Sequence, residues 1–371
     1  MPFGNEGVES GIGLALSGGG FRATMFHCGA LWRLDELGVL ARLDRVSSVS
    51  GGSITAGLLA LRWPALRFQS DAVSNLRELV IQPLRAFCHR TVDAPAIGLG
   101  ALMPGRSSSD LLQTEYAKHL FGAATLRELP DRPRFVFNAT NLATGVSFRF
   151  SRPYAGDYRI GLVRDPAFRV ALAVTASSAF PPFLSPVVIK MDPGAFQRVE
   201  GADLFDQVAY RERLLLTDGG AYDNLGLETV WNRYDTVLTS DAGAPFGLDL
   251  DPEMSWHGQA MRALDIATNQ SRALRKRVLV DEYTRGVRKG AYWGIDTDIR
   301  KYGLADALPV LPSRIRELAS LRTRLDEFTD AEQGRLINWG YAVCDAAMRR
   351  HVTGGADPAP RWPVPELRLD Q

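Results

Sequence analysis

The sequence predicts an α/β fold in which a mostly parallel central sheet is covered by helices, with a helical C-terminal part. Short apolar runs at 12–17 and 46–49 each stop at small residues, and helical patterns follow at 21–37 and 54–61. This alternation of strand and helix is typical of a parallel sheet. Hydrophobic residues make up 46% of the 371 residues and charged residues 23%, enough for a large core without disulfides.

The later elements follow from the same signals. Asp71 is an expected helix N-cap, and Asp110 is expected near another. Pro83 is expected to break or kink a helix, and 94–105 is expected to be a loop rich in Gly, Pro and apolar side chains. In chain order we expect helices over 72–88 and 110–120, a hairpin of strands 135–140 and 146–151, a helix over 168–178, a strand over 214–217, a helix over 225–232, a strand over 236–239, and helices over 256–283, 313–328 and 330–350.

The domain organisation is simple. No internal repeat, linker or low-complexity tract divides the chain, so we expect a single α/β domain over 1–352. Its motifs lie within 12–241 and its helical part covers 256–352. The Pro-rich residues 353–371 are expected to form a tail that lies on the surface.

Composition limits the classes of function. The net charge of +1 gives no support to nucleic-acid binding, which usually needs a basic domain. Three widely spaced cysteines without a C-x-x-C pair suit a reducing compartment. The first residues do not resemble a signal peptide, and no apolar run is long enough to span a membrane. We therefore expect a cytoplasmic protein, with peripheral membrane contact open, and the low share of lysine among the basic residues hints at a bacterial source.

Two glycine-rich turns follow the first two strands. Ser50, in Ser-Val-Ser-Gly-Gly at 48–52, has the small neighbours that a nucleophile on a sharp strand-to-helix turn requires, although Ser48 replaces the usual first glycine. Gly18, Gly19 and Gly20 open onto a helix, where backbone N–H groups can stabilise a developing oxyanion. The alternative for Ser50 is a simple tight turn.

The glycines at 18 and 20 also fit a dinucleotide-binding turn. That fingerprint needs an acidic residue at the end of the second strand. Asp44 has about the right separation but precedes this strand, which instead ends at Ser50. The pattern therefore favours acyl transfer over nucleotide binding.

Asp218 follows a short apolar strand and precedes two glycines. The carboxyl ends of parallel strands gather functional groups at one edge of a sheet, so Asp218 is expected beside Ser50 as its general base. A turn aspartate without function is the alternative. His257 and His351 follow Asp218 and would allow a Ser-Asp-His triad, but no histidine lies at a strand end, which favours a Ser–Asp dyad.

Taken together, these motifs resemble the patatin-like phospholipases, relatives of cytosolic phospholipase A2. Four segments occur in the order found in that family: LSGGGFRA at 16–23, SVSGGS at 48–53, ASSAFPP at 176–182 and TDGGAYDNLG at 217–226. The first resembles the cytosolic phospholipase A2 version, because Ser17 stands where patatins tend to carry aspartate.

The resemblance implies a three-layer α/β/α fold and a serine hydrolase that needs no metal or other cofactor. It implies Ser50 as nucleophile, Asp218 as base, Gly18, Gly19 and Gly20 as oxyanion hole, Arg22 as a ligand of the substrate phosphate, and Asn224 and Asp241 as supports of the loop that carries Asp218. A guanidinium fork suits phosphate oxygens, although a structural ion pair is the alternative for Arg22.

The expected function is therefore hydrolysis of ester bonds in glycerophospholipids or other lipids, through an acyl-enzyme on Ser50. Loop 94–105 is a candidate lid or membrane contact, or a buried loop. Two alternatives stay open: a soluble carboxylesterase with a Ser-Asp-His triad, and a non-catalytic module that binds a nucleotide or other ligand at Gly18–Gly20. The sequence carries no signal for the oligomeric state.

Overall fold

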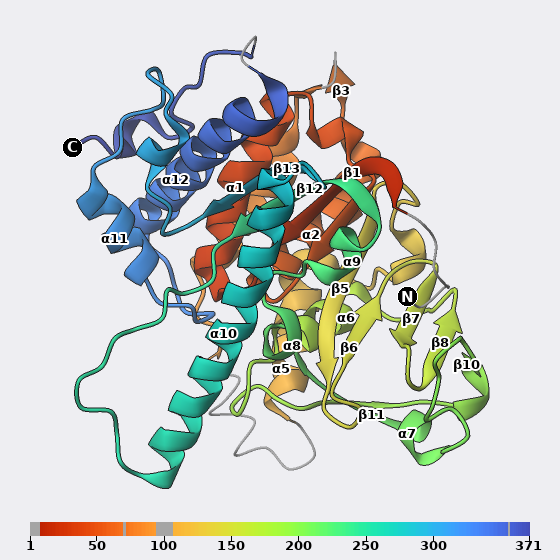
Figure 1. Cartoon of the computed structure of the whole chain (residues 1–371). Helices are drawn as coiled ribbons and strands as arrows, with labels where there is room; N and C mark the ends of the chain where they lie inside the picture. Colours follow the sequence, from red (N-terminus) through yellow and green to blue (C-terminus); the bar gives the residue numbers. More distant parts are fainter. Residues whose placement is uncertain (1–7, 70–71, 94–106, 355–356) are drawn as a thin grey trace.

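The computed structural model describes residues 8–69, 72–93, 107–354 and 357–371. Within these ranges the chain forms an eleven-stranded mixed sheet between two layers of helices (Figure 1). Its parallel part has the order β5-β2-β1-β12-β13. These strands are β1 (Glu9–Leu16), β2 (Arg45–Ser48), β5 (Arg134–Asn141), β12 (Tyr234–Asp241) and β13 (Lys289–Gly294). The predicted α/β class with mostly parallel central strands is confirmed.

Antiparallel strands extend the sheet beyond β5. One edge continues as β6-β7-β8-β10, and a separate pair, β11 and β9, joins β5 through β11. These strands are β6 (Ser147–Phe150), β7 (Tyr154–Asp157), β8 (Gly161–Arg164), β9 (Val187–Lys190), β10 (Phe196–Gln197) and β11 (Arg213–Asp218). A small ribbon of β3 (Phe68–Gln69) and β4 (Ala72–Val73) lies outside the sheet.

Helices cover both faces of the parallel part. On one face lie α1 (Gly20–Glu36), α2 (Gly51–Arg62), α3 (Gln82–Cys88), α5 (Ser108–Tyr116), α6 (Val170–Ser178), α11 (Pro312–Ser320) and α12 (Asp330–Met348). On the other lie α8 (Gly220–Asp223), α9 (Glu228–Trp231) and α10 (Trp256–Thr284), while α7 (Ala209–Glu212) precedes β11. Figure 1 shows α9 and α10 in front of the sheet, with α1 and α2 behind it.

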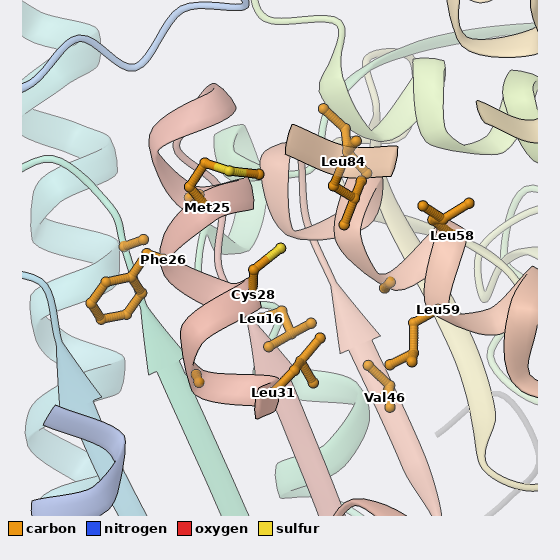
Figure 2. Packing of buried hydrophobic residues seen from close by; sticks show 14 of the residues in the cluster. Leu16, Met25, Phe26, Cys28, Leu31, Val46, Leu58, Leu59 and Leu84 are labelled. Atoms are coloured by element: carbon orange, nitrogen blue, oxygen red, sulfur yellow. The ribbon is translucent and has the colours of Figure 1, made fainter. Parts of the chain in front are cut away.

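The hydrophobic core follows from the alternation of side chains along β1. Leu14 and Leu16 point into a large cluster with α1, α2 and α12, whereas Ala15 points into a smaller cluster with α9 and α10. Figure 2 shows Leu16 packed near Cys28 and Leu31 in the larger cluster. A strand buried on both faces in this way is typical of a parallel sheet covered by helices.

Two glycines allow α1 and α12 to cross at very short range. A Cβ at Gly29 would overlap the carbonyl oxygen of Ile337 in α12, and a Cβ at Gly340 would overlap that of Phe26 in α1. Only glycine lets two helix backbones approach so closely. This crossing joins the first helix of the chain to the last long one.

The first four predicted elements are confirmed as β1, α1, β2 and α2. The predicted hairpin is confirmed as β5 and β6. The predicted helix at 72–88 differs, since its first residues form β4 and a π-helical turn, Arg77–Ile81, runs directly into α3. Pro83 lies one residue after this change of helix type. The prediction that Asp110 lies near an N-cap is confirmed: Ser107 caps α5, and Asp110 completes the capping box three residues later.

The predicted helix over 313–328 ends early, at Ser320. Arg22 donates hydrogen bonds to the carbonyls of Ala319 and Leu321, so these carbonyls do not accept hydrogen bonds from a further helical turn. The strands β7 to β10 and β13 were not predicted, because each is short or contains glycine or charged residues. In the tail, Leu369 is buried and Asn338 donates to the carbonyls of Val364 and Leu367. The predicted N-cap Asp71 and loop 94–105 lie outside the described residues.

We predict that Gly340→Ala destabilises the protein. Alanine favours a helix by about 1 kcal/mol over glycine, but overlap with a backbone atom of α1 costs about 1–3 kcal/mol or more. Urea denaturation should show a lower midpoint with an unchanged slope. Gly247→Ala, in the loop before α10, is the control, because a Cβ there would meet no atom within 4 Å. A Gly340→Ala variant as stable as wild type would contradict the close crossing.

Candidate active site

Ser50 occupies a strained turn between β2 and α2. Its φ of 52° and ψ of −122° are unusual for a residue with a side chain. Two glycines make the turn possible. A Cβ at Gly51 would overlap the carbonyl oxygen of Gly20, and a Cβ at Gly52 would lie 2.5 Å from the carbonyl oxygen of Leu16. Ser48 fits in place of the usual glycine because its hydroxyl donates to the Val136 carbonyl and accepts from Ser53.

Asp218 reaches Ser50 through a change of strand partner along β5. β2 pairs with β5 only as far as Ser48 opposite Phe137, whereas β11 pairs with Asn141 through Ala139. Because β6 holds the opposite edge of β5 at 137–140, β11 lies on the edge that β2 leaves. β11 runs antiparallel to β5, so its end at Asp218 points toward the end of β2. The predicted proximity of Asp218 to Ser50 is therefore present, but the predicted parallel-strand geometry is wrong.

The Asp218 carboxyl is buried, with 2% of its surface exposed. Burial raises the pKa of Asp218 to about 6, because a carboxylate loses hydration in this environment. Hydrogen bonds from the Gly220 N–H, 2.7 Å from Oδ1, and from the Ser50 hydroxyl act in the opposite direction on this pKa. A serine hydroxyl thus faces a carboxylate whose basicity is higher than usual.

The C-terminal end of α6 holds both members of this pair in place. The Ser50 N–H donates to the carbonyl and to Oγ of Ser177, each at 3.1 Å, and the Gly219 N–H donates to the same carbonyl at 3.2 Å. The Asp218 N–H donates to the Ala179 carbonyl at 3.0 Å. Sequence reasoning noted the small residues at 176–182 but assigned Ser177 no role. Its only sequence signal is a serine at a helix end before two prolines.

The glycine loop lies beside Ser50. A Cβ at Gly18 would approach the Ser50 Cβ to 3.1 Å. The Gly18 N–H, however, donates to the Asn224 carbonyl at 3.0 Å. Within the described residues the N–H groups of Gly19 and Gly20 have no such acceptor, and Gly19 and Gly20 have φ of 142° and 58°, which favours glycine. Two of the three predicted oxyanion donors are therefore free.

Two distant segments form the walls around these glycines. A Cβ at Gly19 would lie 2.7 Å from the carbonyl oxygen of Ala242, which follows β12. A Cβ at Gly20 would overlap the carbonyl oxygen of Thr323, which follows α11. The Phe21 N–H donates to the Arg324 carbonyl at 3.2 Å. The loop is thus held from the middle and from the C-terminal part of the chain.

Arg22 connects these two walls. Nη1 donates to the carbonyls of Ala319 and Leu321, both at 2.8 Å, and Nη2 donates to that of Ala242 at 2.7 Å. Only 1% of Arg22 is exposed, and burial lowers its pKa to about 10, so it stays charged at neutral pH. These contacts favour a structural role over the predicted role in binding a substrate phosphate.

Asp241 supports the Ala242 wall. It accepts hydrogen bonds from the Gly243 N–H at 2.9 Å, from Arg272 at 2.8 Å and from the Tyr292 hydroxyl at 2.6 Å. These contacts hold the pKa of Asp241 below its usual range despite complete burial. The predicted supports Asn224 and Asp241 thus contact the glycine loop and its wall rather than only the loop that carries Asp218.

No histidine contacts Ser50 or Asp218. His27 lies behind the glycine loop, with Nε2 2.9 Å from the Ser17 carbonyl oxygen and Nδ1 2.8 Å from Ser240 Oγ. Burial lowers the pKa of His27 to about 4, so it is neutral at physiological pH. His257 and His351 lie against the rings of Trp256 and Tyr302 instead. The structure therefore gives no support to a triad with either residue.

The nucleotide alternative gains no support either. Asp44 accepts a hydrogen bond from the Ile12 N–H at 2.8 Å, near the start of β1 and away from the glycine loop at its end. Within the described ranges, no group of three His, Cys, Asp or Glu side chains is arranged to hold a metal ion.

Comparison with known proteins agrees with this architecture. The sequence profile of the patatin-like phospholipases matches residues 14–231, more than half of the chain, so the chain belongs to that family. No curated protein sequence gives a significant match. The motifs at Gly18–Gly20, Ser50 and Asp218 all lie inside the matched region.

The solved structures that are similar to this chain have low sequence identity to it, and the first described here has a TM-score above 0.5. Human GIVD cytosolic phospholipase A2 is 13% identical with a TM-score of 0.51, over 92% of this chain and 61% of that one. The same human enzyme in complex with methyl gamma-linolenyl fluorophosphonate has 13% identity and a TM-score of 0.49, over 92% and 58% of the two chains. VipD from Legionella pneumophila has 14% identity and a TM-score of 0.37, over 91% and 66%. The present chain thus spans less than two thirds of each.

We predict that Asp218→Asn stabilises the fold while removing the base. The rise of the pKa from 3.8 to about 6 corresponds, at about 1.4 kcal/mol per unit, to about 3 kcal/mol of unfolding free energy lost once Asp218 ionises. This cost is absent below pH 3.8 and complete above pH 6. Asparagine should therefore raise the unfolding free energy by about 1–3 kcal/mol at pH 7 and by less toward pH 4.

Chemical denaturation at several pH values measures this difference. Asp265→Asn, at an exposed position of α10, is the matched control and should change little. A gain for Asp218→Asn that is absent at pH 7, or that does not shrink toward pH 4, would show that burial does not strain this carboxylate.

Proposed function

We propose that this protein is a lipid acyl hydrolase that cleaves ester bonds of glycerophospholipids or related lipids through Ser50 and Asp218. The observation that carries the proposal is the buried Ser50–Asp218 hydrogen bond at a strained strand-to-helix turn, next to two unused glycine N–H groups. Membership of the patatin-like phospholipase family supports lipid hydrolysis as the reaction class.

The first half of the reaction forms an acyl-enzyme. Asp218 accepts the hydroxyl proton of Ser50 while Oγ attacks the ester carbonyl carbon. The carbonyl oxygen becomes an oxyanion, which the N–H groups of Gly19 and Gly20 stabilise at the N-terminus of α1. Asp218 then gives the proton to the departing alcohol or lysolipid, and the ester bond breaks.

The second half regenerates the enzyme. Asp218 accepts a proton from water as the water oxygen attacks the acyl carbon, and the same N–H groups stabilise the second oxyanion. Ser50 leaves with the proton from Asp218, and the fatty acid is released. The raised pKa of Asp218 suits both steps, because a base works best when its pKa lies near the working pH.

Apolar side chains next to the catalytic pair support a lipid substrate. Phe180 follows directly after Ala179, whose carbonyl accepts a hydrogen bond from the Asp218 N–H, and Phe183 lies three residues further along the chain. These two side chains are 46% and 57% exposed. Exposed aromatic side chains beside a site favour contact with acyl chains or a lipid surface. None of the described helices is both long and apolar enough to cross a bilayer. We propose a peripheral contact with the membrane and a cytoplasmic location.

We expect activity to titrate with Asp218. The pH profile of kcat/KM on a short p-nitrophenyl ester and on a fluorogenic phospholipid should rise through an apparent pKa of about 6 and level off above it, since only ionised Asp218 accepts the proton. Ser50→Ala and Asp218→Asn should each lower kcat by at least about 100-fold. A fluorophosphonate probe should label wild type but not Ser50→Ala, and labelling of Ser50→Ala would refute the assignment of the nucleophile.

For Arg22 we propose a positioning role. Arg22→Lys can retain only part of the three carbonyl contacts, so the walls of the glycine loop should loosen. We expect kcat to fall by about 10- to 100-fold on both the phospholipid and the phosphate-free ester. The exposed Arg316→Ala is the matched control and should keep wild-type activity. A loss confined to the phospholipid would instead support the phosphate-binding role.

A further inference from the structure

The long helix α10 is unusually exposed. Its 29 residues would span about 44 Å, yet Leu279 is its only buried side chain. Figure 1 shows its N-terminal part, together with the loop before it, projecting beyond the rest of the molecule. Contacts with the body come from one side of the helix, where Arg272 binds Asp241 and Arg275 pairs with Asp223. The opposite side has no described partner.

That opposite side carries a regular pattern. Ala263, Ile266, Gln270, Leu274 and Arg277 follow one another at intervals of three or four residues, and all five are exposed. We call them the outer face of α10. Intervals of three and four place side chains on one stripe of a helix, as in helices that pack side by side. Ile266 and Leu274, the two large apolar side chains of this outer face, are 46% and 55% exposed.

The outer face is symmetric about Gln270. Ile266 and Leu274 each lie four residues from Gln270, and Ala263 and Arg277 each lie seven residues from it. If two copies of α10 pack antiparallel about this residue, Ile266 meets Leu274 of the second copy. The long Arg277 side chain then lies over the small Ala263 of the second copy. A surface that complements itself in this way is what a two-fold interface requires.

The charges at the two ends of α10 fit the same arrangement. The loop before the helix carries Asp249, Asp251 and Glu253, whereas Arg285 and Lys289 follow its C-terminal end and are exposed. Antiparallel packing brings the acidic end of one copy to the basic end of the other, and it also opposes the two helix dipoles. The apolar Trp256, 84% exposed, would meet the region of Thr284 in the second copy.

We propose that this protein forms a two-fold symmetric dimer through the outer faces of two antiparallel α10 helices centred on Gln270. The proposal does not depend on the proposed function, because the outer face lies opposite the contacts that α10 makes with the body. A lipid surface is the competing occupant. The three acidic residues at the projecting end disfavour an anionic bilayer, and the symmetry about Gln270 has no counterpart in lipid binding.

The oligomeric state of the full chain tests the proposal. Sedimentation or light scattering up to about 100 µM should show a dimer. Ile266→Glu and Leu274→Glu should each raise the dissociation constant by about 30-fold or more, the effect of losing a central apolar contact, without lowering the melting temperature of the monomer. Val208→Glu, at a residue 45% exposed before α7, is the control and should leave the dimer intact.

Cysteine cross-linking tests the antiparallel register, since the three native cysteines are buried. Gln270→Cys should form a disulfide-linked dimer on mild oxidation. Trp256→Cys alone should not, but a mixture of Trp256→Cys and Thr284→Cys should. A chain that stays monomeric at about 100 µM, or a dimer that both glutamate variants leave unchanged, overturns the proposal. A monomer that binds phosphatidylcholine vesicles and loses this binding in the Ile266→Glu and Leu274→Glu variants also overturns it and identifies a lipid-binding face.

Discussion

The change of partner along β5 is the constraint on which the rest of the site depends. β2 pairs with β5 only as far as Phe137. From Ala139 onward, β11 pairs with the same edge of β5 in the antiparallel direction. The strand ends that carry Ser50 and Asp218 therefore approach each other head to head. Ser177 and Ala179, at the end of α6, then fix the backbone of both ends by hydrogen bonds. A purely parallel sheet would place a carboxylate beside Ser50 rather than facing it.

Burial gives the site its chemistry and also opposes folding. Asp218 is more basic because it is removed from water, and for the same reason its ionised form destabilises the folded state. Arg22 is another buried charge, and its positive charge lies near the positive end of the dipole of α1. Hydrogen bonds from Arg22 to three backbone carbonyls offset that cost, and the same hydrogen bonds fix the positions of these carbonyls. The walls of the glycine loop are thus held by hydrogen bonds to a charged group, which are stronger than those to neutral donors.

Sequence reasoning was most successful where a local signal specifies a local structure. Clear apolar periods and glycines at the turns mark the strands predicted over 12–17 and 46–49 and the helix that follows each of them. Both strands and both helices are present in the structure. The sequence-based predictions are wrong where the local structure depends on residues that are distant in the chain. The direction of β11 depends on the edge that β2 leaves free, and the use of the Gly18 N–H depends on Asn224. The end of α11 at Ser320 and the contacts of Arg22 depend on each other across 297 residues, a separation at which no periodic pattern is informative.

The crossing of α1 and α12 has a consequence for the order of events during protein synthesis. α1 and the glycine loop are synthesised well before Thr323, Arg324 and the helix that packs on Gly29. The region matched by the family profile ends at residue 231, well before these segments. A growing chain can therefore contain Ser50, Asp218 and all three glycines and still lack one wall of the glycine loop. The arrangement around these glycines is complete only after Thr323 and Arg324 have been synthesised and have packed against α1.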